Sequence, residues 1–230
     1  MTEYRTTSLG QFGHPELVVD ISSEYTSFLQ WFFSYFENKI KNGGVFRSGQ
    51  TVQIGWMVVK LFSRPDEAIE VCEPSFDQIP IKWCSGVNRT LRDLMVQSKV
   101  CRKLNVKPIF PSILDVGLLS DALIDGRPQF MMSRDIPSEK DCGWGFQELD
   151  PVDLSISYCS LYEIAIKRPM VIPFLAISPV CSIEFIDEGF VISYADRSVS
   201  MNDIEFLQQL GSSAYFGSDF YGKPSNEGSL

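Results

Sequence analysis

In the first hundred residues, short apolar segments typical of strands alternate with segments whose apolar residues recur every 3.6 positions, as in helices. The segment 16–21 is apolar at Leu17, Val18, Val19 and Ile21, which is typical of a strand buried on both faces. A helix is predicted from Glu24 to about Asn42, because two serines precede it, apolar residues recur every 3.6 positions and two glycines follow. Its apolar positions are Tyr25, Phe28, Leu29, Phe32, Phe33, Phe36 and Ile40. Short strands are predicted within 45–83 and a second helix over 88–104.

The second half of the chain has shorter periodic segments separated by turn residues. The predicted strands are 114–118, 129–133, 181–186 and 190–194, the predicted helices are 158–167 and 201–210, and a single helical turn is predicted over 120–126. The last two strands form a predicted hairpin, since only three turn residues separate them.

These elements predict an α+β fold of two sheet-and-helix units, each with a mostly antiparallel sheet covered by one or two helices. The boundary is placed at Asn105–Pro111, which has two prolines and no helical period. The predicted domains are therefore residues 1–108 and 109–230, with a single fused unit as the alternative. The tail after Gly211 is rich in glycine and serine and is expected to be mobile.

Two helices carry side chains beyond a simple apolar stripe. Trp31 and Tyr35 widen the stripe of the first helix, and packing in the core is favoured over contact with a partner. The second helix holds the one basic cluster of the chain, which is predicted to be a solvated face and not a binding patch. Its members are Arg89, Arg92, Lys99, Arg102 and Lys103.

The charge balance narrows the range of partners. The 230-residue chain has a formal net charge of −9 and a pI near 4.7. Binding of nucleic acid needs clustered Lys and Arg, so nucleic acid is not expected as a partner. The same charge suits a basic protein partner, with solubility alone as the alternative. No apolar run approaches the about 20 residues of a membrane span and the N-terminus has no signal core, so we expect a cytoplasmic protein without membrane contact.

Candidate groups for catalysis and metal binding are few. The six cysteines are irregularly spaced and include no C-x-x-C pair, which favours free buried thiols over a disulfide or zinc framework. His14 is the single histidine; it precedes a proline and a strand, and a structural turn role is predicted for it. No G-x-S-x-G, H-E-x-x-H or EF-hand pattern is present. We therefore expect a protein that is not an enzyme and that uses no metal or cofactor.

The richest stretch for binding lies between Gln129 and Phe146. An apolar strand ends at Arg134, and an acidic, proline-broken loop follows it. Its carboxylates are Asp135, Glu139 and Asp141. Arg134 paired with Asp141 would stiffen the loop in a bidentate geometry. Oxygens converging from one loop could also hold a divalent cation, but charged turn residues facing water are the favoured interpretation.

The acidic loop ends in a glycine-flanked aromatic. Gly143 and Gly145 allow positive φ or a close approach of the backbone, while Trp144 fills the space between them. Together with Arg134, these three residues are predicted to shape the loop and not to touch a partner.

Five short motifs follow one another in order between about residues 113 and 195. They are Leu119-Ser120-Asp121 with Gly126, Phe130 with Arg134-Asp135, Asp141-Cys142-Gly143-Trp144-Gly145-Phe146, Leu161-Tyr162-Glu163-Ile164, and Pro169 to Leu175 with Ile172-Pro173. In this order they resemble bacterial immunity protein family thirty-three, a family of polymorphic toxin systems that was formerly a domain of unknown function. The segment with Gly13-His14-Pro15-Glu16-Leu17 is similar to a second small bacterial domain family, also of unknown function.

The resemblance implies an immunity protein that binds and neutralises a cognate bacterial toxin by stoichiometric contact. An acidic loop next to an aromatic has the composition of a hot spot for a basic partner, so Asp135, Glu139 and Asp141 are the candidate contact residues. Two alternatives come from other classes of protein: an intracellular hydrolase that uses the acidic loop, and a regulatory protein-binding module.

Overall fold

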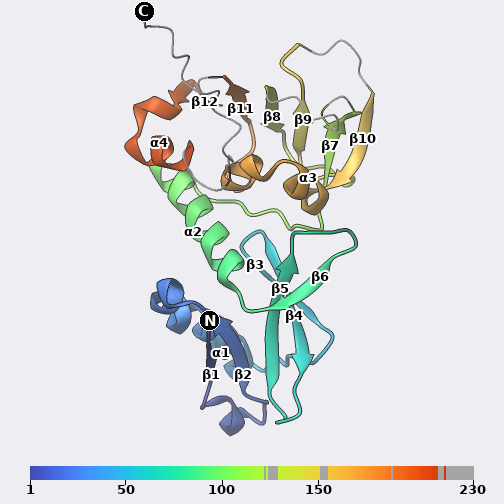
Figure 1. Cartoon of the computed structure of the whole chain (residues 1–230), viewed down its shortest axis with the longest axis vertical. Coiled ribbons are helices and arrows are strands. Elements are labelled where there is room, and N and C mark those ends of the chain that lie inside the picture. The colour runs from blue at the N-terminus through green and yellow to red at the C-terminus, as the bar shows by residue number, and fades with distance from the viewer. Residues whose placement is uncertain (122, 124–128, 151–154, 188, 212–214, 216–230) are drawn as a thin grey trace, which may run out of the picture. The chain divides into compact units, whose positions relative to one another are not determined.

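The chain divides into two compact units (Figure 1). The structure is a computed structural model, and it describes all residues except 122, 124–128, 151–154, 188, 212–214 and 216–230. The N-terminal unit comprises residues 1–96 and the C-terminal unit residues 97–230. The predicted mobile tail and most of the predicted turn over 120–126 lie outside the described residues.

The N-terminal unit is built on a six-stranded sheet. Its strands are β1 (Thr2–Arg5), β2 (Leu17–Ile21), β3 (Thr51–Ile54), β4 (Met57–Ser63), β5 (Ile69–Ser75) and β6 (Lys82–Ser85). They lie in the order β1-β2-β5-β4-β3, and β6 pairs with β5. The β2–β5 pair is parallel and the other pairs are antiparallel. The long apolar run over 51–62 is a hairpin, because the backbone turns at Gly55 with a φ of 62°.

One amphipathic helix supplies much of the core of this unit. The chain enters it through the 3-10 segments η1 (Leu9–Phe12) and η2 (Ser23–Phe28), and α1 runs over Leu29–Lys41. The inward face of α1 buries Phe32, Phe36 and Ile40. The buried core cluster consists of Leu9, Leu17, Val19, Ile21, Phe32, Phe36, Ile40, Ile54, Val59, Leu61, Ile69, Val71, Val87 and Leu91.

The prediction that Trp31 packs in the core is wrong. Trp31 is 46% exposed, because it lies on the side of α1 away from the buried stripe. Tyr35 is half-buried and donates its hydroxyl to the carbonyl of Gln53 at 3.2 Å. The aromatic residues of α1 thus divide into a buried face, with Phe32 and Phe36, and a partly exposed flank, with Trp31 and Tyr35.

The division between the two units falls within helix α2 (Asn88–Lys103). Its last turns carry contacts of the C-terminal unit. The buried Gln97 donates its amide to the carbonyl of Ile172 at 2.8 Å, and the Cys101 thiol donates to the carbonyl of Ala176 at 3.3 Å. The domain boundary predicted from the sequence was 108/109, because prolines follow the helix. In the structure the division between the two units lies at 96/97, inside the helix.

The C-terminal unit is built on a seven-stranded sheet in the order β10-β7-β9-β8-β11-β12-β13. Its strands are β7 (Val116–Ser120), β8 (Phe130–Arg134), β9 (Trp144–Gln147), β10 (Ile156–Ser160), β11 (Cys181–Ile186), β12 (Gly189–Tyr194) and β13 (Arg197–Ser200). Strand β9 lies between β7, with which it is parallel, and β8, with which it is antiparallel.

The α+β fold is as predicted, but the expectation of mostly antiparallel sheets is wrong, since both sheets are mixed. In each unit the parallel pair joins strands that are not consecutive in the chain, because β5 follows its antiparallel neighbour β4 and β9 follows its antiparallel neighbour β8. Strand β9 thereby lies between β7 and β8, a placement that the alternation of apolar residues does not encode.

Short helices complete the C-terminal unit. They are α3 (Leu161–Lys167), η4 (Pro169–Phe174), η5 (Met201–Asp203) and α4 (Glu205–Gly211). A capping box between Ser160 and Glu163 starts α3, where the sequence analysis had started the helix at 158; residues 156–160 form edge strand β10 instead. Among the described residues, no helix has the length and apolar character needed to cross a membrane.

His14 has the structural role predicted for it. It is buried, accepts the backbone N–H of Phe46 at Nε2 (3.0 Å) and lies 2.7 Å from the carbonyl of Pro15 through Nδ1. Both ring nitrogens thus bind backbone groups, which holds the turn before β2 against the segment after α1.

Phe36→Ala tests the core of the N-terminal unit. Phe36 is fully buried, with its ring 5.4 Å from Phe32 and 5.1 Å from Phe46. Truncation is expected to lower the free energy of unfolding by about 3–5 kcal/mol in urea titrations, because it leaves a cavity. Trp31→Ala on the exposed flank of the same helix is the control and should cost far less; equal losses would contradict this assignment of the two faces.

Candidate functional site

Arg134 lies at the end of β8 and joins two other backbone segments of the C-terminal unit to this strand. The residue is only 2% exposed. Its Nη1 donates to the carbonyl oxygens of Ile109 at 2.8 Å and Ile177 at 2.6 Å, with Leu175 further away at 3.4 Å. The backbone carbonyl of Arg134 in turn accepts the N–H of Val180 at 2.7 Å. One side chain therefore holds the segment before β7 and the segment before β11 against the sheet.

The charge of Arg134 has no carboxylate within ion-pair distance among the described residues. Burial lowers the pKa of its guanidinium, and nearby groups, with the Cys142 thiol first among them, act in the opposite direction. Its guanidinium carbon lies 5.4 Å from the centre of the Trp144 ring, a cation–π distance.

Trp144 completes this support from the first position of β9. The ring is fully buried, and its indole N–H donates to the carbonyl of Leu175 at 3.1 Å. Trp144 and Arg134 thus bind the same carbonyl. These hydrogen bonds reach the segments at Ile109 and at Leu175–Ile177 and not the loop itself, so the loop-shaping role of both residues stays a prediction.

The anticipated pairing of Arg134 with Asp141 does not occur, because Asp141 is bonded within its own loop. Its Oδ2 accepts the Ser138 hydroxyl at 2.7 Å and its Oδ1 accepts the backbone N–H of Gly143 at 2.8 Å. The backbone N–H of Ser138 also donates to the carbonyl of Asp141 at 3.1 Å. Asp141 therefore stabilises the turn through both of its carboxylate oxygens.

The other two predicted contact residues point to solvent without internal bonds. Asp135 and Glu139 are exposed, and neither side chain makes a hydrogen bond or ion pair with any described residue. Between them lies Ile136, an apolar side chain that is 77% exposed. The loop thus presents two unpaired carboxylates on either side of an exposed isoleucine.

The two glycines that flank Trp144 have different roles. Gly143 has a φ of 85°, and a Cβ at this position would overlap the carbonyl oxygen of Asp135. That carbonyl lies close because the Asp135 N–H donates to the Gly143 carbonyl at 2.9 Å, which closes the base of the loop. At Gly145 the nearest atom to such a Cβ is the Ser133 hydroxyl at 3.6 Å, so only Gly143 is required there.

A cavity of about 510 Å³ separates the loop from the segment before β7. Arg134 lines it together with side chains from both segments. The other lining residues are Ile109, Phe110, Pro111, Leu114, Asp115, Val116, Pro137, Ser138, Glu139, Lys140, Asp141 and Cys142. The volume is within the range of sites for small ligands, and the lining is part apolar and part charged.

Four large apolar side chains near Arg134 are exposed to solvent. They are Ile109 (45% exposed), Leu114 (54%), Ile136 (77%) and Val180 (68%). Val180 also has a φ of 67°, a left-handed conformation that is costly for a β-branched residue. Ile109, Leu114 and Val180 were not predicted as surface candidates from the sequence, since Ile109 lies in the predicted linker and Leu114 begins a predicted strand.

Metal and thiol chemistry have few candidate groups. Among the described residues, no group of three or more His, Cys, Asp and Glu side chains is arranged to hold a metal ion. Of the six free cysteines, Cys72, Cys101, Cys142 and Cys181 are buried. Burial raises the pKa of the Cys101 thiol to about 12 and that of Cys181 to about 11, so both are protonated near neutral pH.

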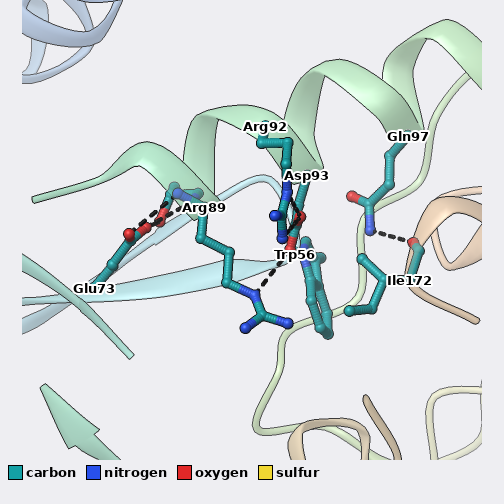
Figure 2. Close-up of polar contacts among 8 residues, drawn as sticks. Trp56, Glu73, Arg89, Arg92, Asp93, Gln97 and Ile172 are labelled. Carbon is teal, nitrogen blue, oxygen red and sulfur yellow. Dashed lines mark hydrogen bonds and ion pairs between the residues drawn. The ribbon is translucent and has the colours of Figure 1, made fainter. Parts of the chain in front are cut away.

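A second polar network, in the N-terminal unit, surrounds the start of α2 (Figure 2). The buried Glu73 of β5 accepts the backbone N–H groups of Arg89 (3.1 Å) and Thr90 (2.7 Å) and the Thr90 hydroxyl (2.9 Å). A carboxylate at this position satisfies N–H groups that a helix start leaves without partners. Burial raises the pKa of Glu73, while these hydrogen bonds act in the opposite direction.

Asp93, one turn further along α2, is fully buried and organises two arginines. It accepts Nε and Nη2 of Arg92, both at 3.2 Å, and the Trp56 indole N–H at 3.3 Å, and Arg89 lies 3.9 Å away. Arg89 also stacks on Phe76, with 3.7 Å to the ring centre. The predicted solvated face holds only in part for Arg89 and Arg92, whose side chains are 28% and 37% exposed and also pair with the buried Asp93. The spacing of Arg89 and Asp93 by four residues was the signal available in the sequence.

The comparisons with known proteins give no relative for this chain. A scan against protein-family models, a search of curated proteins and a search of solved structures each found no match.

Gly143→Ala tests the closure of the loop. The substitution should lower the free energy of unfolding by about 1–3 kcal/mol, because it combines an unfavourable φ with overlap on the Asp135 carbonyl. Gly145→Ala is the matched control in the same motif and should change stability by less than about 1 kcal/mol. Thermal or urea unfolding of both variants measures the difference, and a Gly143 variant as stable as the control would contradict the assignment.

Alkylation by iodoacetamide at about pH 8 tests the thiol environments. Cys84 is exposed and should react first, whereas Cys101 and Cys181 should react only in denaturant, since both are buried and remain protonated. Mass spectrometry of peptides after timed quenching measures each rate. Labelling of Cys101 or Cys181 in the native protein as fast as that of Cys84 would show that the packing around Arg134 is not as described.

Proposed function

We propose that this protein binds another protein stoichiometrically through the acidic face of its C-terminal unit, and that it turns over no substrate. The acidic face is defined as the loop 135–142 together with Ile109, Leu114 and Val180. What supports the proposal is one observation: a loop that internal bonds hold in place exposes two unpaired carboxylates and Ile136, and Ile109, Leu114 and Val180 add three exposed apolar side chains next to it. Exposed apolar groups beside charges are a mark of protein interaction sites.

The fixed loop favours affinity. Its base is closed by the pairing of Asp135 with Gly143, and its turn is bonded through Asp141, so little backbone entropy would be lost on binding. An interface of standard size covers about 800 Å² on each partner, which one loop and its neighbouring segments can supply.

The nature of the partner follows from charge and from the family resemblance. The net charge of −9 and the exposed Asp135 and Glu139 favour a basic partner, because opposite fields raise association rates and select against acidic proteins. The resemblance to immunity protein family thirty-three suggests a cognate bacterial toxin met in the cytoplasm. We therefore propose an immunity protein that blocks such a toxin by covering its active site or by interfering with its folding.

Single charge reversals test this proposal with the toxin encoded by the neighbouring gene as the binding partner. Asp135→Lys and Glu139→Lys should each weaken binding about tenfold or more, or about 1.4 kcal/mol, with an unchanged melting temperature, since neither side chain has an internal partner among the described residues. Isothermal titration calorimetry measures the affinity and the stoichiometry.

Glu184→Lys is the matched control, because it makes the same charge change at an exposed position of β11 outside the loop. It should alter affinity only slightly. Unchanged affinity in both loop variants would remove the loop from the interface. An equal loss in all three variants would show that net charge, and not this face, governs binding.

A further inference from the structure

A buried arginine without a counter-ion is uncommon in a folded protein. Charged side chains removed from water are normally paired with an opposite charge, because their desolvation is costly. Arg134 is 2% exposed and has no carboxylate within ion-pair distance among the described residues. The proposed contact with a toxin does not explain this feature, since Arg134 lies below the exposed face.

The hydrogen bonds of Arg134 leave one edge of its guanidinium without protein partners. All three of its bonds to carbonyl oxygens are made by Nη1. Within the described part of the chain, Nε is buried without a partner and Nη2 has no hydrogen bond either. In a guanidinium, Nε and Nη2 form the edge that binds carboxylates in a bidentate manner; here Nε is closed off from water, so Nη2 is the donor that a ligand in the cavity would reach first.

The cavity beside this residue has room for such a carboxylate. Arg134 lines the cavity of about 510 Å³, which is closed on two sides by the segment 109–116 and the loop 137–142. Apolar walls are supplied by Ile109, Phe110 and Leu114. A small organic acid with an aliphatic side chain would match both the charged floor and these walls.

The carboxylates of the same cavity restrict the ligand further. Asp115, Glu139 and Asp141 also line it, and they would repel a dianion such as phosphate. Both oxygens of Asp141 and one oxygen of Asp115 already accept protein N–H or O–H groups, whereas Glu139 has no such bond. A ligand that carries an ammonium group next to its carboxylate would complement Arg134 and Glu139 together.

We propose that this cavity binds a carboxylate through the unpartnered edge of Arg134, and that it favours a carboxylate with a cationic group beside it. A free α-amino acid carries both groups, whereas the C-terminal residue of a polypeptide carries a neutral amide beside its carboxylate, so a free amino acid is the proposed ligand. The inference does not depend on the proposed toxin partner, because it concerns the chain alone.

Nuclear magnetic resonance of the indole N–H groups offers a local test. The chain has four tryptophans, and Trp144 is the one that stacks on Arg134 at 5.4 Å. L-Leucine and N-acetyl-L-leucine should each shift the Trp144 cross-peak in a saturable manner while leaving Trp31 and Trp83 unmoved. L-Leucinamide, which lacks the carboxylate, should not shift it. L-Leucine should bind more tightly than N-acetyl-L-leucine because of its ammonium group.

Because a substitution of the buried Arg134 could prevent folding, a second variant fills the cavity and leaves Arg134 in place. Leu114 is 54% exposed and lines the cavity, so Leu114→Tyr should fold and weaken L-leucine binding at least tenfold. Ile156→Tyr is the matched control at an exposed position of β10 that does not line the cavity, and it should bind as the wild type does. Arg134→Lys keeps the charge but removes the planar fork, and it should lose binding.

The remaining comparisons decide the proposal. A short peptide that ends in leucine with a free carboxylate should bind more weakly than L-leucine, because its last residue carries an amide in place of the ammonium group; tighter binding of the peptide would overturn the preference for an amino acid. No saturable shift of Trp144 with either carboxylate would overturn the proposal. So would tighter binding of inorganic phosphate, equal binding of L-leucinamide, or full binding by Leu114→Tyr.

Discussion

The arrangement of the C-terminal unit depends on a buried cation, the guanidinium of Arg134, which main-chain carbonyl groups hold. Arg134 binds the carbonyls of Ile109 and Ile177 and contacts the ring of Trp144, so it joins the segment before β7, the segment before β11 and strand β9. Hydrogen bonds from a charged donor are worth roughly 1.5–3 kcal/mol each, which is large against the usual stability of a domain. Fixing these segments also fixes both ends of the acidic loop.

The acidic face owes its charge to this arrangement. Because the cation lies inside and Asp141 is bonded to Ser138 and Gly143, Asp135 and Glu139 remain at the surface without internal partners among the described residues. Had Arg134 paired with Asp141 at the surface, the loop would have presented less negative charge and more freedom. The burial of Arg134 and the negative charge of the loop are thus linked, because the buried arginine does not neutralise the loop carboxylates.

Much of the fold could be predicted from the sequence, because periodicity and turn residues report local structure directly. The stripe through Phe32 and Phe36 and the hairpin of β11 and β12 are examples. The parallel pairs β2–β5 and β7–β9 could not be predicted, since strand order depends on contacts between distant segments. For the same reason, the sequence indicated Arg134 as important but gave it Asp141 as a partner; its carbonyl partners lie 25 to 43 residues away and carry no signature of side-chain type.

Hydrogen–deuterium exchange of the protein with and without the proposed toxin partner tests whether the fixed acidic face is the binding surface. The account predicts slower amide exchange on complex formation over residues 109–114 and 135–140, with little change along the β3–β4 hairpin of the N-terminal unit. Protection confined to the N-terminal unit, with the acidic loop exchanging as in the free protein, would contradict it.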